Sequence, residues 1–254
     1  MNDTTHIEVR NLTMAYGSRL IMQEVAFSVP RGTVTAIVGG SGCGKSTLLR
    51  HMLGLLEPVS GEVLYSGESF TAALPARRNE MLRRFGVTFQ QGALWSSMTL
   101  LENVALPIEE YTKLPPGDVV SLARLKLSLV GLSGFEDYYP ADISGGMRKR
   151  AGLARALALD PEVLFFDEPS AGLDPVSSRR LDELILKVCG TTGASVIIVT
   201  HELASIFAIA AQAVFLDVAT KRVGAIGSPR ELAQNPPSES VRSFFAAGHF
   251  DAGA

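Results

Sequence analysis

The sequence predicts an α/β protein with a mostly parallel sheet, an antiparallel β part near the N-terminus and a helical subdomain inserted into the core. Three observations predict this class. Apolar strand-like runs alternate with helical stretches from about residue 144 to 217, which implies parallel strands with right-handed crossovers. A glycine-rich loop separates an apolar run from a helical stretch near residue 40. A largely helical region lies between these two parts.

Composition limits the functional class. The chain has 254 residues, of which 46% are apolar and 19% charged, with a formal net charge of −3. This balance argues against nucleic-acid binding through bulk positive charge. No run reaches the roughly 18 apolar residues that cross a bilayer, and no signal peptide is expected at the N-terminus. Cys43 and Cys189 form no zinc or disulfide spacing. A soluble cytoplasmic protein is expected, with room for a membrane-embedded partner.

The N-terminal third predicts strands joined by turns. Short strands are expected at residues 7–9 and 25–29, with a turn at residues 16–18 between them. Residues 34–38 are apolar apart from one threonine, as in a strand covered on both faces. The glycine-rich loop follows, and then a helix from Ser46 to about residue 55.

The remainder divides into a helical part, a second α/β part and a tail. Helices are expected near residues 99–105 and 118–130, separated by a Leu-Pro-Pro-Gly break. The later elements are a helix from 144 to about 159, strands at 163–166, 195–200 and 213–217, and helices at 176–188 and 203–210. The predicted domain is therefore a core of about 6–89 and 158–227, a helical subdomain of about 90–157 and a helical tail of about 228–254.

The glycine-rich loop carries the clearest chemical signal. It fits the pattern G-x-x-x-x-G-K-[ST] and stands between a predicted strand and a predicted helix, the context that a P-loop requires. Backbone N–H groups of such a loop bind phosphate oxygens, the lysine adds a positive charge, and the serine hydroxyl binds Mg²⁺. The alternative is a chance glycine-rich turn. The expected phosphate-binding residues are Gly39, Gly40, Ser41, Gly42, Cys43, Gly44, Lys45, Ser46 and Thr47.

A second strand ends in two carboxylates. Residues 163–166 are apolar and run into Asp167 and Glu168. Asp167 is expected to hold the Mg²⁺ shell, while Glu168 points elsewhere and is the candidate base that polarises the attacking water. A solvated acidic turn is the alternative for such a pair.

Three further side chains are candidates at strand ends and turns. His201 follows a predicted strand and is placed to contact the γ-phosphate. Gln90 also follows a strand and is placed to reach the metal or the water. Tyr16 stands in a turn, from which its ring can stack on a base. Taken singly, each is as readily a solvated or structural residue.

Ser144, Gly145 and Gly146 stand at the start of a predicted helix. A serine cap, two glycines and the positive end of a helix make a second anion site. One chain needs a single phosphate cradle, so a second cradle implies that ATP is shared between two subunits.

Together these motifs resemble those of the ATP-binding cassette (ABC) ATPases, over about residues 7–217. Residues 39–47 match the Walker A motif, and residues 164–168 match Walker B, with Glu168 at the position of the catalytic base. The remaining matches are the signature motif at Ser144, Gly145, Gly146 and Met147, the Q-loop at Gln90, the D-loop at residues 170–174 ending in Asp174, the switch histidine at His201 and the adenine-stacking aromatic at Tyr16.

The resemblance implies a head-to-tail homodimer that holds two ATP with Mg²⁺ and drives an integral membrane permease from the cytoplasmic face of the inner membrane. Ser46, Asp167 and Gln90 are the implied metal-binding residues. Met147 stands where the signature motif usually has glutamine. That form is similar to the ATPases of Mla-type phospholipid transporters, as are residues 89–95 with 103–104 and 235–244. This subgroup works with an Mce-domain lipid-binding protein, and in some systems with a STAS-domain regulator.

Alternatives remain at two points. The basic triplet Arg148-Lys149-Arg150 is interpreted either as a solvated helix face or as a patch facing the partner's ATP. At the level of function, the alternatives to lipid transport are the ATPase of another importer, for amino acids or other small solutes, and an ABC ATPase acting on ribosomes or DNA. The last usually needs two cassettes or a long coiled-coil insertion, and the sequence has neither.

Overall fold

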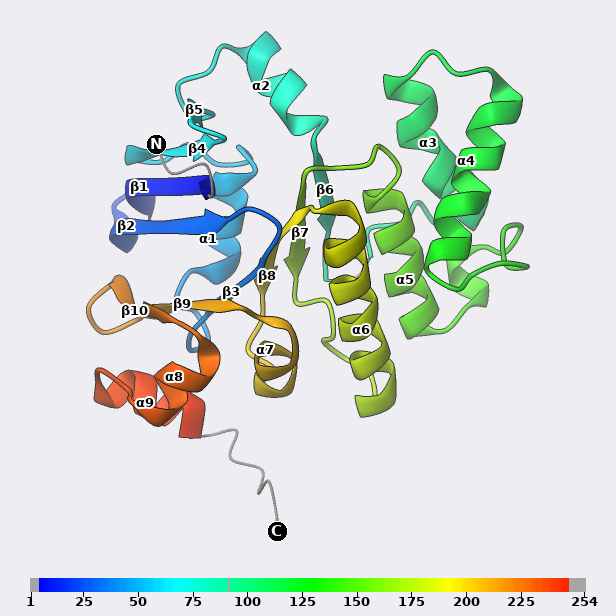
Figure 1. The fold of residues 1–254 in the computed structure, drawn as a ribbon. Helices are drawn as coiled ribbons and strands as arrows, with labels where there is room; N and C mark the ends of the chain where they lie inside the picture. Colours follow the sequence, from blue (N-terminus) through cyan, green and yellow to red (C-terminus); the bar gives the residue numbers. More distant parts are fainter. Residues whose placement is uncertain (1–4, 91, 247–254) are drawn as a thin grey trace. The chain divides into compact units, whose positions relative to one another are not determined.

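The computed structural model describes residues 5–90 and 92–246. It consists of two compact units (Figure 1). Unit 1 is drawn from Met1–Arg78 and Ser195–Ala254, and unit 2 is Asn79–Ala194. The predicted division at 89/90 and 157/158 stays a prediction, and strands Phe85–Thr88 and Val163–Asp167, which lie outside the predicted helical subdomain, pair within unit 2. Gln91 and the end of the predicted tail lie outside the described residues.

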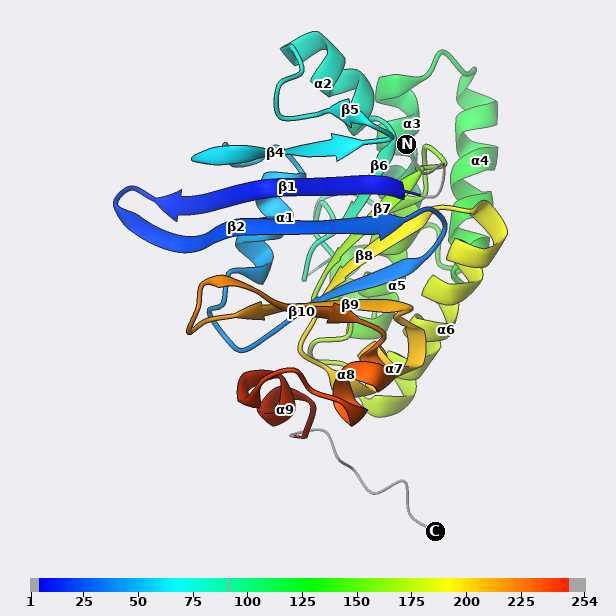
Figure 2. The ribbon, with the colours of Figure 1, turned by 60° about the vertical axis from the view of Figure 1, so that its left-hand side comes forward.

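Unit 1 contains an antiparallel sheet. Its strands are β1 (Thr5–Tyr16), β2 (Arg19–Pro30), β4 (Ser60–Tyr65) and β5 (Glu68–Ser69), in the order β2-β1-β4-β5. Figure 2 shows β1 and β2 as two long neighbouring arrows. Both are longer than the strands predicted at 7–9 and 25–29, because register shifts such as that between Val9 and Leu12 break the alternation on which the prediction depends.

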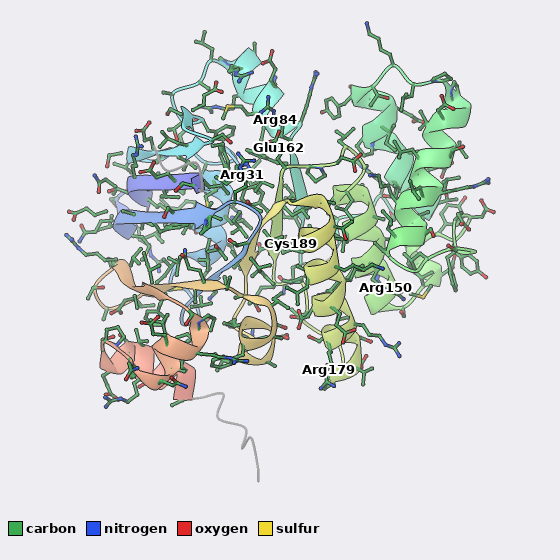
Figure 3. The ribbon with its side chains drawn as sticks, in the orientation of Figure 1. Arg31, Arg84, Arg150, Glu162, Arg179 and Cys189 are labelled. Atoms are coloured by element: carbon green, nitrogen blue, oxygen red, sulfur yellow. The ribbon has the colours of Figure 1, made fainter. Side chains whose placement is uncertain are left out.

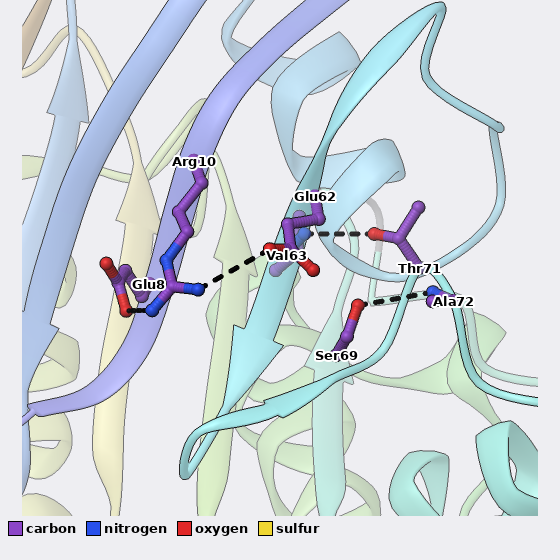
Figure 4. Close-up of polar contacts among 7 residues, drawn as sticks. All are labelled: Glu8, Arg10, Glu62, Val63, Ser69, Thr71 and Ala72. Carbon is purple, nitrogen blue, oxygen red and sulfur yellow. Dashed lines mark hydrogen bonds and ion pairs between the residues drawn. The ribbon is translucent and has the colours of Figure 1, made fainter. Parts of the chain in front are cut away.

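The outer face of this sheet carries charge (Figure 4). Arg10 donates to Glu8 at 2.6 Å and to Glu62 on the neighbouring strand at 3.5 Å. The hydrogen bond from Arg10 lowers the pKa of the Glu8 carboxyl below its ordinary value. All three side chains are more than a third exposed, so these ion pairs add little to stability.

Unit 1 also contains parallel strands. Strand β3 (Val34–Val38) lies between β8 (Ser195–Val199) and β9 (Gln212–Asp217) and is parallel to both. Strand β10 (Arg222–Gly227) pairs antiparallel with β9. Every residue of β3 and β8 is buried, as expected for strands covered on both faces. The helices are α1 (Lys45–Met52), α7 (Leu203–Ile209), α8 (Pro229–Gln234) and α9 (Glu239–Ala246).

Unit 2 has two strands and four longer helices. Strand β6 (Phe85–Thr88) is parallel to β7 (Val163–Asp167). The helices are α3 (Leu100–Tyr111), α4 (Pro116–Leu129), α5 (Gly145–Ala156) and α6 (Pro175–Thr192), with a short 3₁₀ turn at Pro140–Asp142. Helix α2 (Pro75–Leu82) precedes β6. Arg84 and Glu162 lie together at the starts of the two strands, where their side chains are 3.5 Å apart (Figure 3).

Helices occur at both places predicted in the middle of the chain. Helix α3 begins at the predicted site because Thr99 and Glu102 form a capping box, in which each side chain accepts from the other's backbone N–H. It continues past the predicted end to Tyr111. Helix α4 begins with a proline at its first position, where a missing N–H costs nothing. Within the described part of the chain, no helix has both the length and the apolar character needed to cross a bilayer.

Candidate nucleotide-binding site

The glycine-rich loop lies in unit 1, between β3 and α1. Gly39 adopts φ +144°, and a Cβ there would lie 2.5 Å from Leu216 O and 2.9 Å from Cys43 Sγ. Gly44 adopts φ +100° as the N-cap of α1, and its Cβ would lie 2.8 Å from a methyl group of Ile21. Side chains are therefore excluded at both ends of the loop by sterics and by backbone conformation. The loop can keep this conformation only with glycine at both positions.

Lys45 closes the loop on itself. Its Nζ donates to Gly39 O at 3.0 Å and to Gly40 O at 3.1 Å, and it lies 3.9 Å from Cys43 Sγ. The side chain is only 9% exposed. Burial raises the pKa of the Cys43 thiol above its ordinary value. A phosphate oxygen at Lys45 would therefore compete with these two carbonyl oxygens.

The start of α1 favours an anion. Gly44 provides no side-chain cap, and the first turn has no acidic residue, whereas the last turn carries Arg50 and His51. The positive end of the helix dipole therefore faces the loop, with no acidic side chain of the first turn to offset it. Ser46 and Thr47 are half-buried in this first turn.

Two other predicted residues lie in unit 1. His201 is exposed and follows β8, which is parallel to β3, with Ile37 paired to Val199. His201 and the glycine-rich loop therefore leave the sheet at the same edge, the carboxyl edge where ligands of such sheets bind. Tyr16 ends β1 in the turn to β2, with its side chain 45% exposed.

The acidic pair lies in unit 2. Asp167 is the last residue of β7, and Glu168 adopts φ +49°, in the left-handed region that residues other than glycine rarely occupy. This change of direction turns Glu168 away from the line of the strand. Gln90 is exposed and follows β6, whose Thr88 pairs with Phe166. Gln90 and the acidic pair therefore leave unit 2 at the same edge of its two strands.

The predicted second anion site forms the N-terminus of α5. The Ser144 hydroxyl accepts a hydrogen bond from Met147 N at 3.2 Å, and the first turn has no acidic residue. Ser144 is exposed, while Gly145, Gly146 and Met147 are half-buried. Gly145 has open space around it, since its nearest neighbour to an added Cβ is an Arg148 nitrogen at 3.8 Å.

Asp174 has a structural role within its own chain. It caps α6, and its Oδ1 accepts from Val176 N and Ser177 N at 3.0 Å each. Hydrogen bonding from Ser177 and from these backbone groups holds the pKa of the Asp174 carboxyl below its ordinary value. A nucleotide contact at this residue stays a prediction.

The structure contradicts one interpretation of the basic triplet of α5, a solvated helix face, while contact with the partner's ATP stays a prediction. Arg148 donates to Pro140 O at 3.3 Å and Ile143 O at 2.8 Å, and Arg150, labelled in Figure 3, donates to Val130 O at 3.1 Å. Lys149 donates to Glu168 O and Ala171 O. All three side chains are half-buried. Their hydrogen bonds connect α5 to loops of unit 2. The spacing of residues in the sequence does not reveal this role, because the partners are backbone carbonyls.

Unit 2 also contains a cavity of about 670 Å³ beside β6 and α3. Its wall includes Phe89 and Trp95, which are 40% and 59% exposed, and Tyr111, whose ring lies 5.2 Å from the Arg83 guanidinium. The remaining wall residues are Asn79, Leu82, Phe85, Gly86, Val87, Leu106, Pro107, Glu110, Arg155, Ala156 and Leu159. The cavity lies beside β6, the strand that precedes Gln90.

Sequence reasoning noted Asn103 only within the resemblance at 103–104 and missed its structural role, which is to hold Trp95 in the wall of this cavity. It is fully buried, accepts from Trp95 N at 2.7 Å and donates to Trp95 O at 3.0 Å and Thr99 O at 2.9 Å. This pattern fixes the segment that carries Trp95. The signal for this role in the sequence is an asparagine on the apolar face of a predicted helix, where a buried polar side chain needs hydrogen-bond partners.

The predicted metal-binding residues offer a hydroxyl, a carboxylate and an amide oxygen, from Ser46, Asp167 and Gln90. These are hard oxygen donors of the kind that Mg²⁺ prefers. Among the described residues, no cluster of three or more histidine, cysteine or acidic side chains forms a metal site. Mg²⁺ at nucleotides is commonly held by a few protein groups together with phosphate oxygens and water. The donor set fits an ion that arrives with a nucleotide.

Three comparisons place these features among known proteins. The family model described as ABC transporter matches residues 22–171. The chain is 45% identical over 195 residues to the probable ribonucleotide transport ATP-binding protein mkl of Mycobacterium leprae, covering 77% of this chain but only 56% of that relative. It is 39% identical over 238 residues to the intermembrane phospholipid transport system ATP-binding protein MlaF of Escherichia coli, covering 94% of this chain and 87% of MlaF.

Solved structures show the same fold. The dimeric ATP-binding cassette MJ0796, bound to ADP and Pi, has a TM-score of 0.79 at 26% identity and covers 87% of this chain and 98% of its own. The cbiO1 protein from Clostridium perfringens, part of an ABC transporter complex, has a TM-score of 0.81 at 25% identity and covers 96% of this chain and 99% of its own. The predicted fold class and the predicted resemblance are both confirmed.

Proposed function

Since this chain belongs to the ABC transporter family, we propose that it is the ATP-hydrolysing subunit of a transporter that moves phospholipid or a related lipid between two membranes. The observation that carries the lipid assignment is the 39% identity to MlaF over 94% of the chain. The glycine-rich loop and the acidic end of β7 supply the chemistry. The chain is then peripheral, at the cytoplasmic face of the inner membrane.

In the proposed reaction, the β- and γ-phosphates of ATP lie over the start of α1. Lys45 releases Gly39 O and Gly40 O and pairs with phosphate oxygens. Glu168 takes a proton from water as the water oxygen bonds to the γ-phosphorus. The bond to the bridging oxygen breaks, and its electron pair remains on ADP.

Other residues orient the substrate. Tyr16 stacks on the adenine, and His201 contacts the γ-phosphate. Ser46, Asp167 and Gln90 would hold Mg²⁺, which would neutralise charge on the phosphate oxygens.

The N-terminus of α5 is proposed to complete the site of a second copy. Ser144, Gly145, Gly146 and Met147 contact the γ-phosphate of ATP bound to the partner subunit, and Asp174 lies at the same interface. Two features support a head-to-tail dimer: the uncompensated positive end of α5 and the dimeric form of MJ0796. ATP then closes the dimer, and hydrolysis reopens it.

The cavity of unit 2 is proposed to receive the permease. Its exposed aromatic side chains suit an apolar helix face, and Arg83 and Glu110 can pair with charges beside it. An Mce-domain lipid-binding protein and a STAS-domain regulator are the further partners proposed for this assembly.

A second candidate is an importer of small solutes. The observation in its favour is the name of the mycobacterial relative, which assigns ribonucleotide transport to that protein. The higher coverage of MlaF favours lipid.

Mass spectrometry of what co-purifies with the chain from detergent-solubilised membranes separates the two. A permease with an Mce-domain protein and bound phospholipid is the expected result. A periplasmic solute-binding protein in place of the Mce-domain protein would support the second candidate and contradict the first. Genes for an Mce-domain protein beside that of this chain are an independent check.

A further inference from the structure

Helix α5 carries several cationic side chains that donate hydrogen bonds to backbone carbonyls of unit 2. Arg148 and Arg150 reach loops at 140–143 and 130–131, and Arg155 reaches Gly92 and Ala93. Lys149 differs from these because its partners belong to the segment that carries Glu168. This contact joins the helix of the second anion site to the proposed catalytic base of the same chain.

The Lys149 ammonium holds both ends of one tight turn. Its Nζ donates to Ala171 O at 2.6 Å and to Glu168 O at 3.3 Å. The turn itself is closed by Ala171 N, which donates to Glu168 O at 3.2 Å. A charged donor on two carbonyls forms stronger hydrogen bonds than a neutral one would. The turn is therefore fixed by a side chain that belongs to α5.

The backbone of Glu168 needs such support. Glu168 adopts φ +49°, and residues with a Cβ keep that conformation only where their surroundings impose it. The direction of its carboxylate follows from this backbone angle. A relaxed turn would move the carboxylate away from the position that it needs for the attacking water.

We propose that Lys149 is a positioning residue for ATP hydrolysis: it holds the backbone of Glu168 in the left-handed conformation and so aims the carboxylate at the attacking water. The inference rests on the proposed function. Since Ser144 begins the same helix, a shift of α5 on binding the partner's ATP reaches Glu168 through Lys149. Lys149 thereby makes hydrolysis at one site depend on closure at the other.

The test compares kcat and KM for MgATP in the chain purified together with its membrane subunits. Lys149→Met keeps the length of the side chain and removes its hydrogen bonds. We expect about a tenfold lower kcat, in line with the effect of misplaced catalytic groups, with KM within about twofold of the wild-type value. Lys149→Gln retains an N–H donor, so its kcat should lie between those of the wild type and of Lys149→Met.

Lys126→Met is the matched control. Lys126 is a buried lysine of unit 2, with its side chain 5% exposed and its Nζ 2.5 Å from Oδ1 of Asp160, a residue that lies outside the 168–171 turn in the sequence. We expect it to lower the melting temperature while leaving kcat within about twofold, as its bond lies outside the reaction. An equal loss of kcat in Lys126→Met and Lys149→Met would show that general destabilisation is responsible, and would overturn the inference.

A double-mutant cycle with Glu168→Gln tests the route of the effect. If Lys149 acts through the Glu168 carboxylate, Lys149→Met should change the residual single-turnover rate of Glu168→Gln by less than about twofold. A full tenfold decrease in that background would overturn the inference. A wild-type assembly that binds MgATP without hydrolysing it would contradict the proposed function itself, whereas normal hydrolysis by both Lys149 variants would contradict only the role of Lys149.

Discussion

At the scale of single residues, Gly39 offers a sharp test of the nucleotide loop. In Gly39→Ala the new methyl group would lie 2.5 Å from a backbone oxygen, at a φ of +144°. We expect at least tenfold weaker binding of a fluorescent ATP analogue, since the loop cannot keep its shape. Gly40→Ala is the matched control, because a Cβ at Gly40 meets no atom within 4 Å. Equal affinities for the two variants would contradict the proposed fit of the loop.

Glu168→Gln separates binding from hydrolysis. The amide cannot accept the proton of water, so hydrolysis should fall by a factor on the order of 10²–10⁴, the range of general-base contributions. ATP affinity should stay within a few fold, and light scattering should detect a stable dimer in MgATP. Turnover at the wild-type rate would remove Glu168 from the role of base.

His51 predicts a pH dependence of stability. The side chain is 4% exposed and hydrogen-bonds to Leu56 O at 2.9 Å, and burial lowers its pKa. The unfolded chain, with an ordinary histidine pKa of about 6.5, therefore takes up a proton that the folded chain resists. His51 contributes to stability above that pH, and the contribution is lost as the pH falls below it.

Urea unfolding at pH 7.5 and pH 5.5 checks this sign. The wild-type chain should lose more free energy of unfolding between the two values than His51→Gln does. Equal losses would assign the pH dependence to other groups.

At the scale of elements, the capping box of α3 is a local and measurable contribution. Thr99→Ala removes the acceptor of Glu102 N and should lower the free energy of unfolding by about 1 kcal/mol. Ser121→Ala is the control, because Ser121 lies inside α4 and bonds only within its own helix. Urea unfolding that gave the two variants equal stability would show that the cap is not needed to start α3.

The sequence predicts elements best where one physical signal dominates. Strands β3, β7 and β8 lie within a residue of their predicted bounds, because each is a continuous apolar run closed by a polar or glycine residue. Helix α2 was not predicted, since among its residues only Met81 is buried and its sequence has no apolar stripe. Strand β10 was not predicted either, because only Ala225 in it is buried.

The candidate site, like the helices and strands, could be predicted where one clear pattern marks it. Loop residues follow from a fixed pattern, so residues 39–47 could be named directly. The left-handed turn at Glu168 and the carbonyl partners of Lys149 could not be predicted. Both depend on how the backbone at 168–171 lies against α5, about 20 residues away in the sequence. The capping role of Asp174 was readable in principle, since an aspartate followed by proline commonly begins a helix.

At the scale of the whole molecule, the proposed dimer can be tested without disturbing the fold. Ser144→Asp keeps an N-cap acceptor for Met147 N but places a negative charge where the partner's γ-phosphate is proposed to lie. We expect an unchanged melting temperature, with loss of the MgATP-induced dimer when the variant is combined with Glu168→Gln. The measurement is the molar mass by light scattering.

Ser228→Asp is the matched control for this variant. Ser228 caps α8 in the same way, accepting from Glu231 N at 3.2 Å. Its replacement should leave the dimer intact. A dimer that survived in Ser144→Asp would exclude Ser144 from the shared site.

The two backbone contacts of Lys45 have a consequence for the choice of ligand. Because its charge is already shared between two carbonyls of the loop, any incoming anion competes with the protein's own backbone. A small anion makes few hydrogen bonds and so competes poorly with the two carbonyl oxygens. A polyphosphate can bind the lysine and the N–H groups of the helix together. We therefore expect the loop to bind a nucleotide more tightly than free phosphate.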